Sequence, residues 1–280
     1  MDRQGFIDFN MRLSPENSGK ADSYARAIKI LDGVLPYQDT IDLHGQSLYD
    51  ITDTAVIEAV LHVVNDEVRK MKTGQQSIFD HGNPNQRSYP MKSFCSAALK
   101  SLMNYAQYEQ DIQVADRIVA DETNPRTIST KLMSHFDITR EGEDFVFEAK
   151  RRKGQDYFRH MILANYGGHC ALTGINIPEL LLASHIVPWA DKSHQKDRLN
   201  PCNGICLSAL YDRAFDRGLI TISPDDYTVR LSSALREYET QDYYDRHFGN
   251  ISGQKITLPD NYKPSKDFLA YHRDHVFVGN

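Results

Sequence analysis

The sequence lacks long apolar segments. No window approaches the run of about eighteen apolar residues that a membrane-spanning helix requires. Residues 1–20 also lack the basic, apolar and small-residue order of a secretory signal peptide. We therefore expect a cytoplasmic protein that has no membrane partner.

Cysteine is also scarce. The chain has four cysteines, namely Cys95, Cys170, Cys202 and Cys206. They are too few and too unevenly spread for the disulfide framework of a small secreted fold. A zinc site with His169 or His194 would need closely paired cysteines, but Thr173 stands at the partner position after Cys170. We expect reduced, buried thiols and no structural zinc.

The chain has no overall excess of positive charge. Its formal net charge is -6, so the surface as a whole does not favour nucleic acid. Residues 149–198 nevertheless hold eight Lys or Arg against four Asp or Glu, a local excess that would tolerate a polyanion. With 40% hydrophobic and 25% charged residues, the 280-residue chain has a globular composition and a length that suits two domains.

The first part of the chain favours helices. Residues 22–36, 53–74 and 88–108 repeat apolar side chains at helical spacing, with Asp53 as a capping residue. Such amphipathic helices bury one another, so we expect a helical domain at 1–110 that serves in recognition or interaction.

The rest of the chain changes character. Residues 111–148 mix charge with turn residues, which predicts a connector that can include a short helix and leads into a strand at 144–148. The domain at 149–280 is then expected to contain a helix, two strands, a second helix and a hairpin. These elements are expected at 154–167, 180–187, 203–208, 209–218 and 218–232. The fold class is therefore α+β.

One constellation suits phosphodiester hydrolysis, which needs a base for water and a cation for the phosphoryl charge. His185 ends the apolar run "LLLASHIV", and Asn203 is a residue type that holds loops through backbone hydrogen bonds. Asp212 and Asp216 are four residues apart, so a helix would place both carboxylates on one face. A buried core histidine and a surface ion pair of Asp216 with Arg213 are the alternatives.

Several separated blocks resemble the HNH endonucleases, also called ββα-metal nucleases, in their bacterial restriction and defence branch. The matching residues are Cys170, Thr173, Gly174, Ala183, Ser184, His185, Ile186, Pro188, Trp189, Asn203, Gly204, Leu207, Asp212, Phe215, Asp216 and Gly218. The resemblance covers about residues 150–278. It implies a C-terminal HNH nuclease domain in which His185 is the general base, Asn203 the structural residue and Asp212 a metal ligand.

The chain departs from the family in one respect. Many HNH nucleases carry a second ligand, Asp or His, directly before the general base, and Ser184 stands there. Asp216 is the candidate second ligand, and carboxylates with water suit Mg²⁺ or Mn²⁺.

Basic side chains near the motif are candidates for phosphate contact, although a solvated surface is the alternative for the run at 150–153. These candidates are Arg151, Arg152, Lys153, Arg159, Lys192, Arg198, Arg213 and Arg217.

The resemblance implies metal-dependent hydrolysis of DNA, with 5′-phosphate and 3′-hydroxyl ends, in restriction or another anti-phage defence. Two alternatives remain. One is a degenerate HNH module that binds DNA without cutting it, and the other is a subunit that acts only with a defence partner protein. A double-strand break from one metal centre per chain would suggest a homodimer.

Overall fold

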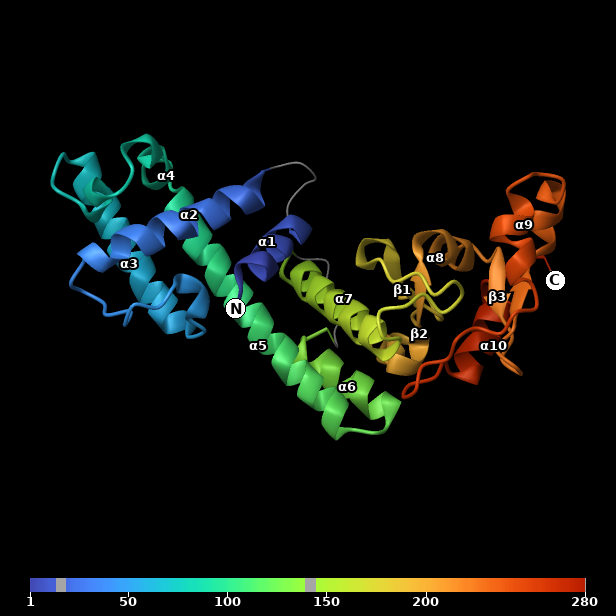
Figure 1. Ribbon diagram of the computed structural model, residues 1–280. Helices are drawn as coiled ribbons and strands as arrows, with labels where there is room; N and C mark the ends of the chain where they lie inside the picture. Colours follow the sequence, from blue (N-terminus) through green and yellow to red (C-terminus); the bar gives the residue numbers. More distant parts are fainter. Residues whose placement is uncertain (14–18, 139–144, 280) are drawn as a thin grey trace. The chain divides into compact units, whose positions relative to one another are not determined.

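The computed structural model describes residues 1–13, 19–138 and 145–279 (Figure 1). The chain forms two compact units, Met1–Ile112 and Gln113–Asn280, and the division falls within one helix, α5 (Phe94–Asp121). In the described part of the chain, no helix is long and apolar enough to cross a membrane.

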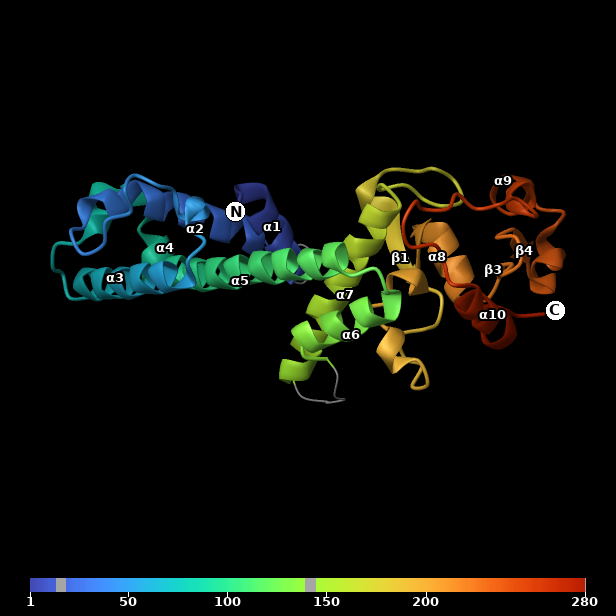
Figure 2. The same cartoon turned by 90° about the horizontal axis from the view of Figure 1, so that it is seen from below.

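The first unit is helical, as predicted (Figure 2). Its helices are α1 (Arg3–Arg12), α2 (Lys20–Val34), α3 (Thr54–Lys72), α4 (Ser88–Met91) and the first part of α5. The Asp53 carboxylate accepts a hydrogen bond from the Ala55 amide, which confirms the predicted cap of α3. Helix α1 was not predicted from the sequence, although the Asp2 carboxylate caps it by accepting a hydrogen bond from the Gly5 amide.

One large core, beside a small cluster of Ile7, Ala21 and Ala25, stabilises the first unit. Ser96 Oγ donates to Asn65 Oδ1 at 2.7 Å and so joins α5 to α3. The core contains the fully buried side chains Phe6, Ile28, Leu31, Leu48, Ile57, Val60, Val64, Leu99 and Leu102. Residues from α1, α2, α3 and α5 thus share one apolar interior.

A connector was predicted at 111–148, but most of these residues belong to helices. Helix α5 continues to Asp121, and α6 occupies Pro125–His135. The Asn124 side chain accepts hydrogen bonds from the amides of Arg126 and Thr127, and Pro125 is the first helical residue, a combination that starts helices. The strand expected at 144–148 is also wrong, because α7 begins at Phe145; Asp144 lies outside the described residues.

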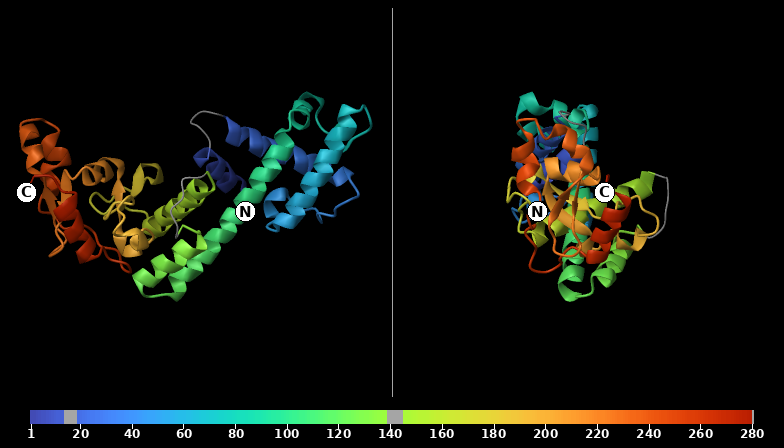
Figure 3. Two further views of the ribbon diagram at one scale, coloured as in Figure 1. Left: turned by 180° about the vertical axis from the view of Figure 1, so that it is seen from behind. Right: turned by 90° about the vertical axis from the view of Figure 1, so that its right-hand side faces the viewer.

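The second unit contains short antiparallel strands among helices, which confirms the α+β class. Its further elements are α7 (Phe145–Asn165), β1 (Leu181–His185), β2 (Gly204–Ser208), α8 (Ala209–Asp216), β3 (Ile220–Ile222), β4 (Val229–Leu231), α9 (Tyr244–His247) and α10 (Lys266–His275). Strands β1 and β2 pair with His185 opposite Gly204 and Leu181 opposite Ser208. Helix α10 packs against β3 (Figure 3).

Short 3-10 helices join many of these elements. They lie at Leu35–Tyr37, Leu48–Asp50, Ile78–His81, Pro84–Gln86, Pro178–Leu180, Gln195–Asp197, Pro201–Asn203, Ser233–Tyr238 and Gly249–Ile251.

Candidate active site

Three of the predicted site residues, His185, Asp212 and Asp216, line one cleft in the second unit. The cleft has a volume of about 520 Å³ and lies among β1, the loop after it, α8 and α10. Its lining residues are Leu182, Ala183, Ser184, His185, Ile186, Pro188, Trp189, Asp212, Arg213, Asp216, Arg217, His272 and Val276. Asn203 does not line this cleft, but it hydrogen-bonds the backbone of the loop that follows β1.

His185 ends β1, and aromatic side chains hold its ring. The imidazole stacks on Phe158 of α7 at 3.8 Å between centroids and meets Trp189 edge-on at 5.5 Å. Nε2 lies 2.9 Å from the Arg198 carbonyl oxygen, which can only accept, so Nε2 carries the proton. The neutral ring therefore has its lone pair on Nδ1.

Desolvation is the main cause of the low pKa of His185. It lowers the pKa to about 4, although the hydrogen bond to the Arg198 carbonyl acts in the opposite direction. His185 is therefore neutral at physiological pH, and a neutral imidazole can accept a proton.

Asn203 holds the backbone that follows His185 through side-chain hydrogen bonds. Its side chain is 1% exposed, and Oδ1 accepts a hydrogen bond from the Val187 amide at 2.8 Å. Nδ2 donates to the carbonyl oxygens of Asp197 at 3.1 Å and Val187 at 3.4 Å. Asn203 thus ties the end of β1 to the loop that supplies the His185 partner.

The two acidic side chains of α8 face the cleft together. Ser184 is 2% exposed, and its Oγ donates to Asp212 Oδ1 at 2.6 Å. Partial desolvation raises the pKa of Asp216, and the neighbouring charge of Asp212 raises it further. Repulsion between two carboxylates is relieved by a bound cation.

The donor atoms suit a hard divalent cation only with water as an additional ligand. In the residues that the structure describes, no group of three or more His, Cys, Asp or Glu side chains gathers to hold a metal. Asp212 and Asp216 offer two carboxylates, and Mg²⁺ is commonly bound through one or two carboxylates, several waters and substrate phosphates. The donor set therefore fits Mg²⁺ or Mn²⁺ better than zinc.

The predicted phosphate-binding residues divide into two groups. Arg213 and Arg217 are exposed and line the cleft, and Arg152 and Lys192 are also exposed, while Arg151 and Lys153 are half-buried on α7.

Arg159 and Arg198 make structural contacts within the protein, and their contact with DNA stays a prediction. Arg159 donates to the carbonyl oxygens of Leu181 and Pro178, at the start of β1. Arg198 is buried, places its guanidinium over the Trp189 ring and donates from Nε to the Trp189 carbonyl oxygen at 2.9 Å.

His272 lines the cleft but was not predicted from the sequence. It is 1% exposed, stacks on Phe215 at 3.7 Å and donates from Nε2 to the Phe215 carbonyl oxygen at 3.1 Å. Nδ1 lies 2.9 Å from Thr221 Oγ1. The segment around it was part of the family resemblance, but no local pattern marks a histidine that far along the chain.

Comparison with known proteins gives a family. Residues 170–223 match the family model described as HNH endonuclease, and no curated protein matches the chain. The matched segment includes β1, β2, α8 and β3, with His185, Asn203 and Asp212, and ends before α10. HNH nucleases generally use a divalent metal ion and act on nucleic acid. The resemblance to the HNH endonucleases is thereby confirmed at the level of the family, for the segment of residues 170–223.

Proposed function

We propose that this chain is a metal-dependent endonuclease that hydrolyses DNA phosphodiester bonds in restriction or another anti-phage defence. One observation carries the proposal: a neutral histidine with an available Nδ1 lone pair shares a cleft with two carboxylates of a matched HNH segment. A base and a cation-binding pair are the two elements that this hydrolysis requires.

His185 is the proposed general base. Nδ1 accepts a proton from the attacking water, while the Arg198 carbonyl keeps the proton of the ring on Nε2. The imidazole is held in one orientation by stacking on Phe158 and by the loop that Asn203 anchors. Because the ring is already oriented in the folded protein, the reaction does not have to supply the entropy cost of orienting it.

Asp212 and Asp216 are the proposed ligands of the cation. When bound, a hard divalent cation neutralises charge on the phosphoryl oxygens and the leaving oxygen. We assign Ser184 to positioning, because its hydroxyl already donates to Asp212 Oδ1 and so fixes that carboxylate. Arg213 and Arg217 line the same cleft and are the proposed contacts to flanking phosphates.

Plasmid cleavage tests the proposal. We expect the native chain to cut supercoiled DNA with Mg²⁺ or Mn²⁺ and to leave it intact in EDTA. His185→Ala and Asp212→Ala should each lower the rate by about 100-fold or more, because general-base and metal contributions have that size. Unmodified and phage-modified plasmids are compared side by side, since a defence nuclease discriminates between them.

Two exposed residues serve as matched controls. His62→Ala on α3 and Asp242→Ala remove the same side-chain types outside the cleft and should leave cleavage unchanged. Equal thermal melting of all variants excludes misfolding. If the native chain binds DNA but cuts no substrate with any divalent cation, autonomous cleavage is wrong, and activity that returns on co-expression with a defence partner supports the partner-dependent subunit.

A further inference from the structure

The first unit carries a basic groove along α2, in a region that the match to the HNH family does not include. The groove has a volume of about 280 Å³. It lies between Arg26, Lys29 and Gly33 of α2 and Gly82, Asn83 and Gln86 of the opposite segment. We call it the α2 groove.

The chemistry of the α2 groove suits a phosphate backbone. Arg26 and Lys29 are exposed and three residues apart on α2, so their charges lie on one helix face. Asn83 and Gln86 add amide groups, which can donate and accept hydrogen bonds. A Cβ added at Gly33 would meet no atom within 4 Å, so the groove is open at this glycine.

An aromatic pair stands next to the groove. The Tyr37 and His81 rings stack at 4.1 Å between centroids with an interplanar angle of 5°. Tyr37 is 56% exposed and His81 is also exposed, although burial stabilises aromatic rings. His81 directly precedes the groove residue Gly82, so the stacked pair lies next to the Gly82 end of the groove.

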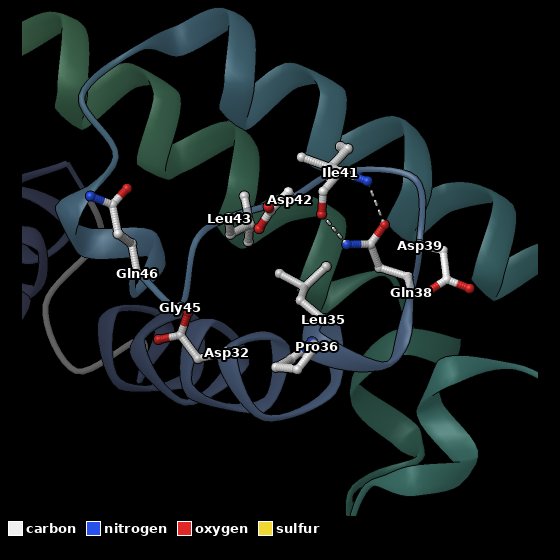
Figure 4. A pocket seen from close by; sticks show the side chains of 10 residues that line it. All are labelled: Asp32, Leu35, Pro36, Gln38, Asp39, Ile41, Asp42, Leu43, Gly45 and Gln46. Carbon is white, nitrogen blue, oxygen red and sulfur yellow. Dashed lines mark hydrogen bonds between the residues drawn. The ribbon is translucent and has the colours of Figure 1, made fainter.

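The neighbouring surface has the opposite charge. Asp32, Asp39 and Asp42 line a hollow of about 450 Å³ formed with the loop after α2 (Figure 4). The Gln38 side chain holds this loop through hydrogen bonds with the Ile41 amide and carbonyl. Acidic walls repel a polyanion, so this hollow does not suit such a ligand, whereas the α2 groove does.

We propose that the α2 groove binds an unpaired stretch of DNA, with phosphates at Arg26 and Lys29 and a base stacked on the Tyr37–His81 pair. Exposed rings beside cations are the features by which proteins hold single strands, since every base has a π face. An acidic protein would satisfy the two cations but would not account for the coplanar rings. The choice of DNA rests on the proposed nuclease function.

Binding by the full-length chain in EDTA, where no cleavage is expected, tests the proposal. The probe is a fluorescein-labelled oligothymidylate of about twenty nucleotides, with its duplex as the second probe, and anisotropy reports binding. The pair Arg26→Ala and Lys29→Ala should weaken single-strand binding about ten-fold and reduce the salt slope by about 1.4. The pair Lys72→Ala and Lys100→Ala removes two exposed cations of the same unit outside the groove and should have no effect.

Two further variants separate phosphate contact from base stacking. Gly33→Glu places a negative charge in open space of the groove and should weaken binding, while Gly33→Gln, of equal size and no charge, should not. Tyr37→Ala should weaken binding to the single strand about ten-fold and leave duplex binding unchanged, because one stacked base contributes about 1–3 kcal/mol.

The outcomes separate this proposal from the nuclease proposal. Native affinity in the Arg26 and Lys29 variant, or in Tyr37→Ala, would overturn the α2 groove as a single-strand site, whether or not the chain cuts plasmid. Groove-dependent binding by a chain that cuts nothing would support the groove and contradict the nuclease.

Discussion

His185 derives its charge state from the residues around it. A solvated histidine has a pKa of about 6.5, but stacking on Phe158 and the surrounding protein remove water and lower the pKa of His185 to about 4. A lower pKa makes a weaker base, yet it keeps the base unprotonated over the whole physiological range. His185 is thus a weaker proton acceptor than a solvated histidine, but a larger fraction of it is unprotonated at neutral pH.

The pH profile of cleavage should reflect this shift. We expect kcat/KM for plasmid cleavage to show no loss from His185 protonation between about pH 7 and pH 5 and to fall below about pH 4, where the imidazole binds a proton. The measurement is an initial-rate series at constant ionic strength and saturating Mn²⁺, with circular dichroism at each pH. A midpoint near pH 6.5 in folded protein would contradict the low pKa of the base.

Ser184 offers a test of positioning against direct ligation. Ser184→Ala removes the hydrogen bond to Asp212 Oδ1 but keeps both carboxylates, so we expect Mn²⁺ binding to weaken by about ten-fold. Calorimetry in the absence of DNA measures the affinity, and Ser252→Ala, at an exposed site, is the control. Loss of binding as complete as in Asp212→Ala would instead make Ser184 a ligand.

At the residue scale, the sequence brought out side chains that are marked by local patterns. His185, Asp212 and Asp216 were identified from short patterns, and they line one cleft because β1 and α8 are adjacent in the fold. Arg159 and Arg198 were assigned to DNA because their charge is visible in the sequence, whereas the carbonyl oxygens that they bind are set by the fold.

At the scale of elements, the packing of β2 on α7 depends on one glycine. A Cβ at Gly204 would lie 2.5 Å from Ile162 Cδ1 and 2.7 Å from Phe158 Cζ. Gly204 is also the β2 residue opposite His185. Any side chain at Gly204 therefore displaces the Phe158 ring on which His185 stacks.

Gly204→Ala should destabilise the second unit by about 1–3 kcal/mol, the usual cost of overpacking. Urea unfolding followed by tryptophan fluorescence measures the change, because the one tryptophan, Trp189, lies against His185. Ile162→Ala is the paired variant, since it makes room for the new methyl group. A double variant as unstable as the sum of both single changes would show that the two sites do not interact.

Helix α10 is joined to α8 and β3 by a histidine that must remain neutral. Desolvation lowers the pKa of His272 to about 4, so the unfolded chain takes up a proton near pH 6.5 while the folded chain does not. Stability should therefore fall by up to roughly 3 kcal/mol between pH 6.5 and pH 4. Denaturant titrations across this range, with His272→Gln as the comparison, measure the slope, and an equal slope in both proteins would contradict the assignment.

The sequence predicted elements best where turn and capping signals enclosed an apolar pattern. β1, β2, α8 and the β3–β4 hairpin were expected near their observed bounds, as was α3 with its cap. Helix α6 and the end of α5 were not predicted, because residues 111–138 are rich in charge. A helix that buries only part of one face shows a weak periodicity of apolar residues. The α10 contacts with Phe215 and Thr221 are long-range and have no local signature.

At the scale of the whole molecule, one chain contains one His185 cleft, so the proposed nuclease would cut one strand per event. We expect nicked circles to accumulate before linear plasmid when enzyme is limiting, and the linear fraction to rise with protein concentration if two copies must meet on opposite strands. The measurement is the nicked-to-linear ratio over a series of protein concentrations, with sedimentation of the free chain alongside. Linear DNA without a nicked intermediate at every concentration would contradict independent single-strand cuts, because it requires two clefts that act together in a preformed homodimer.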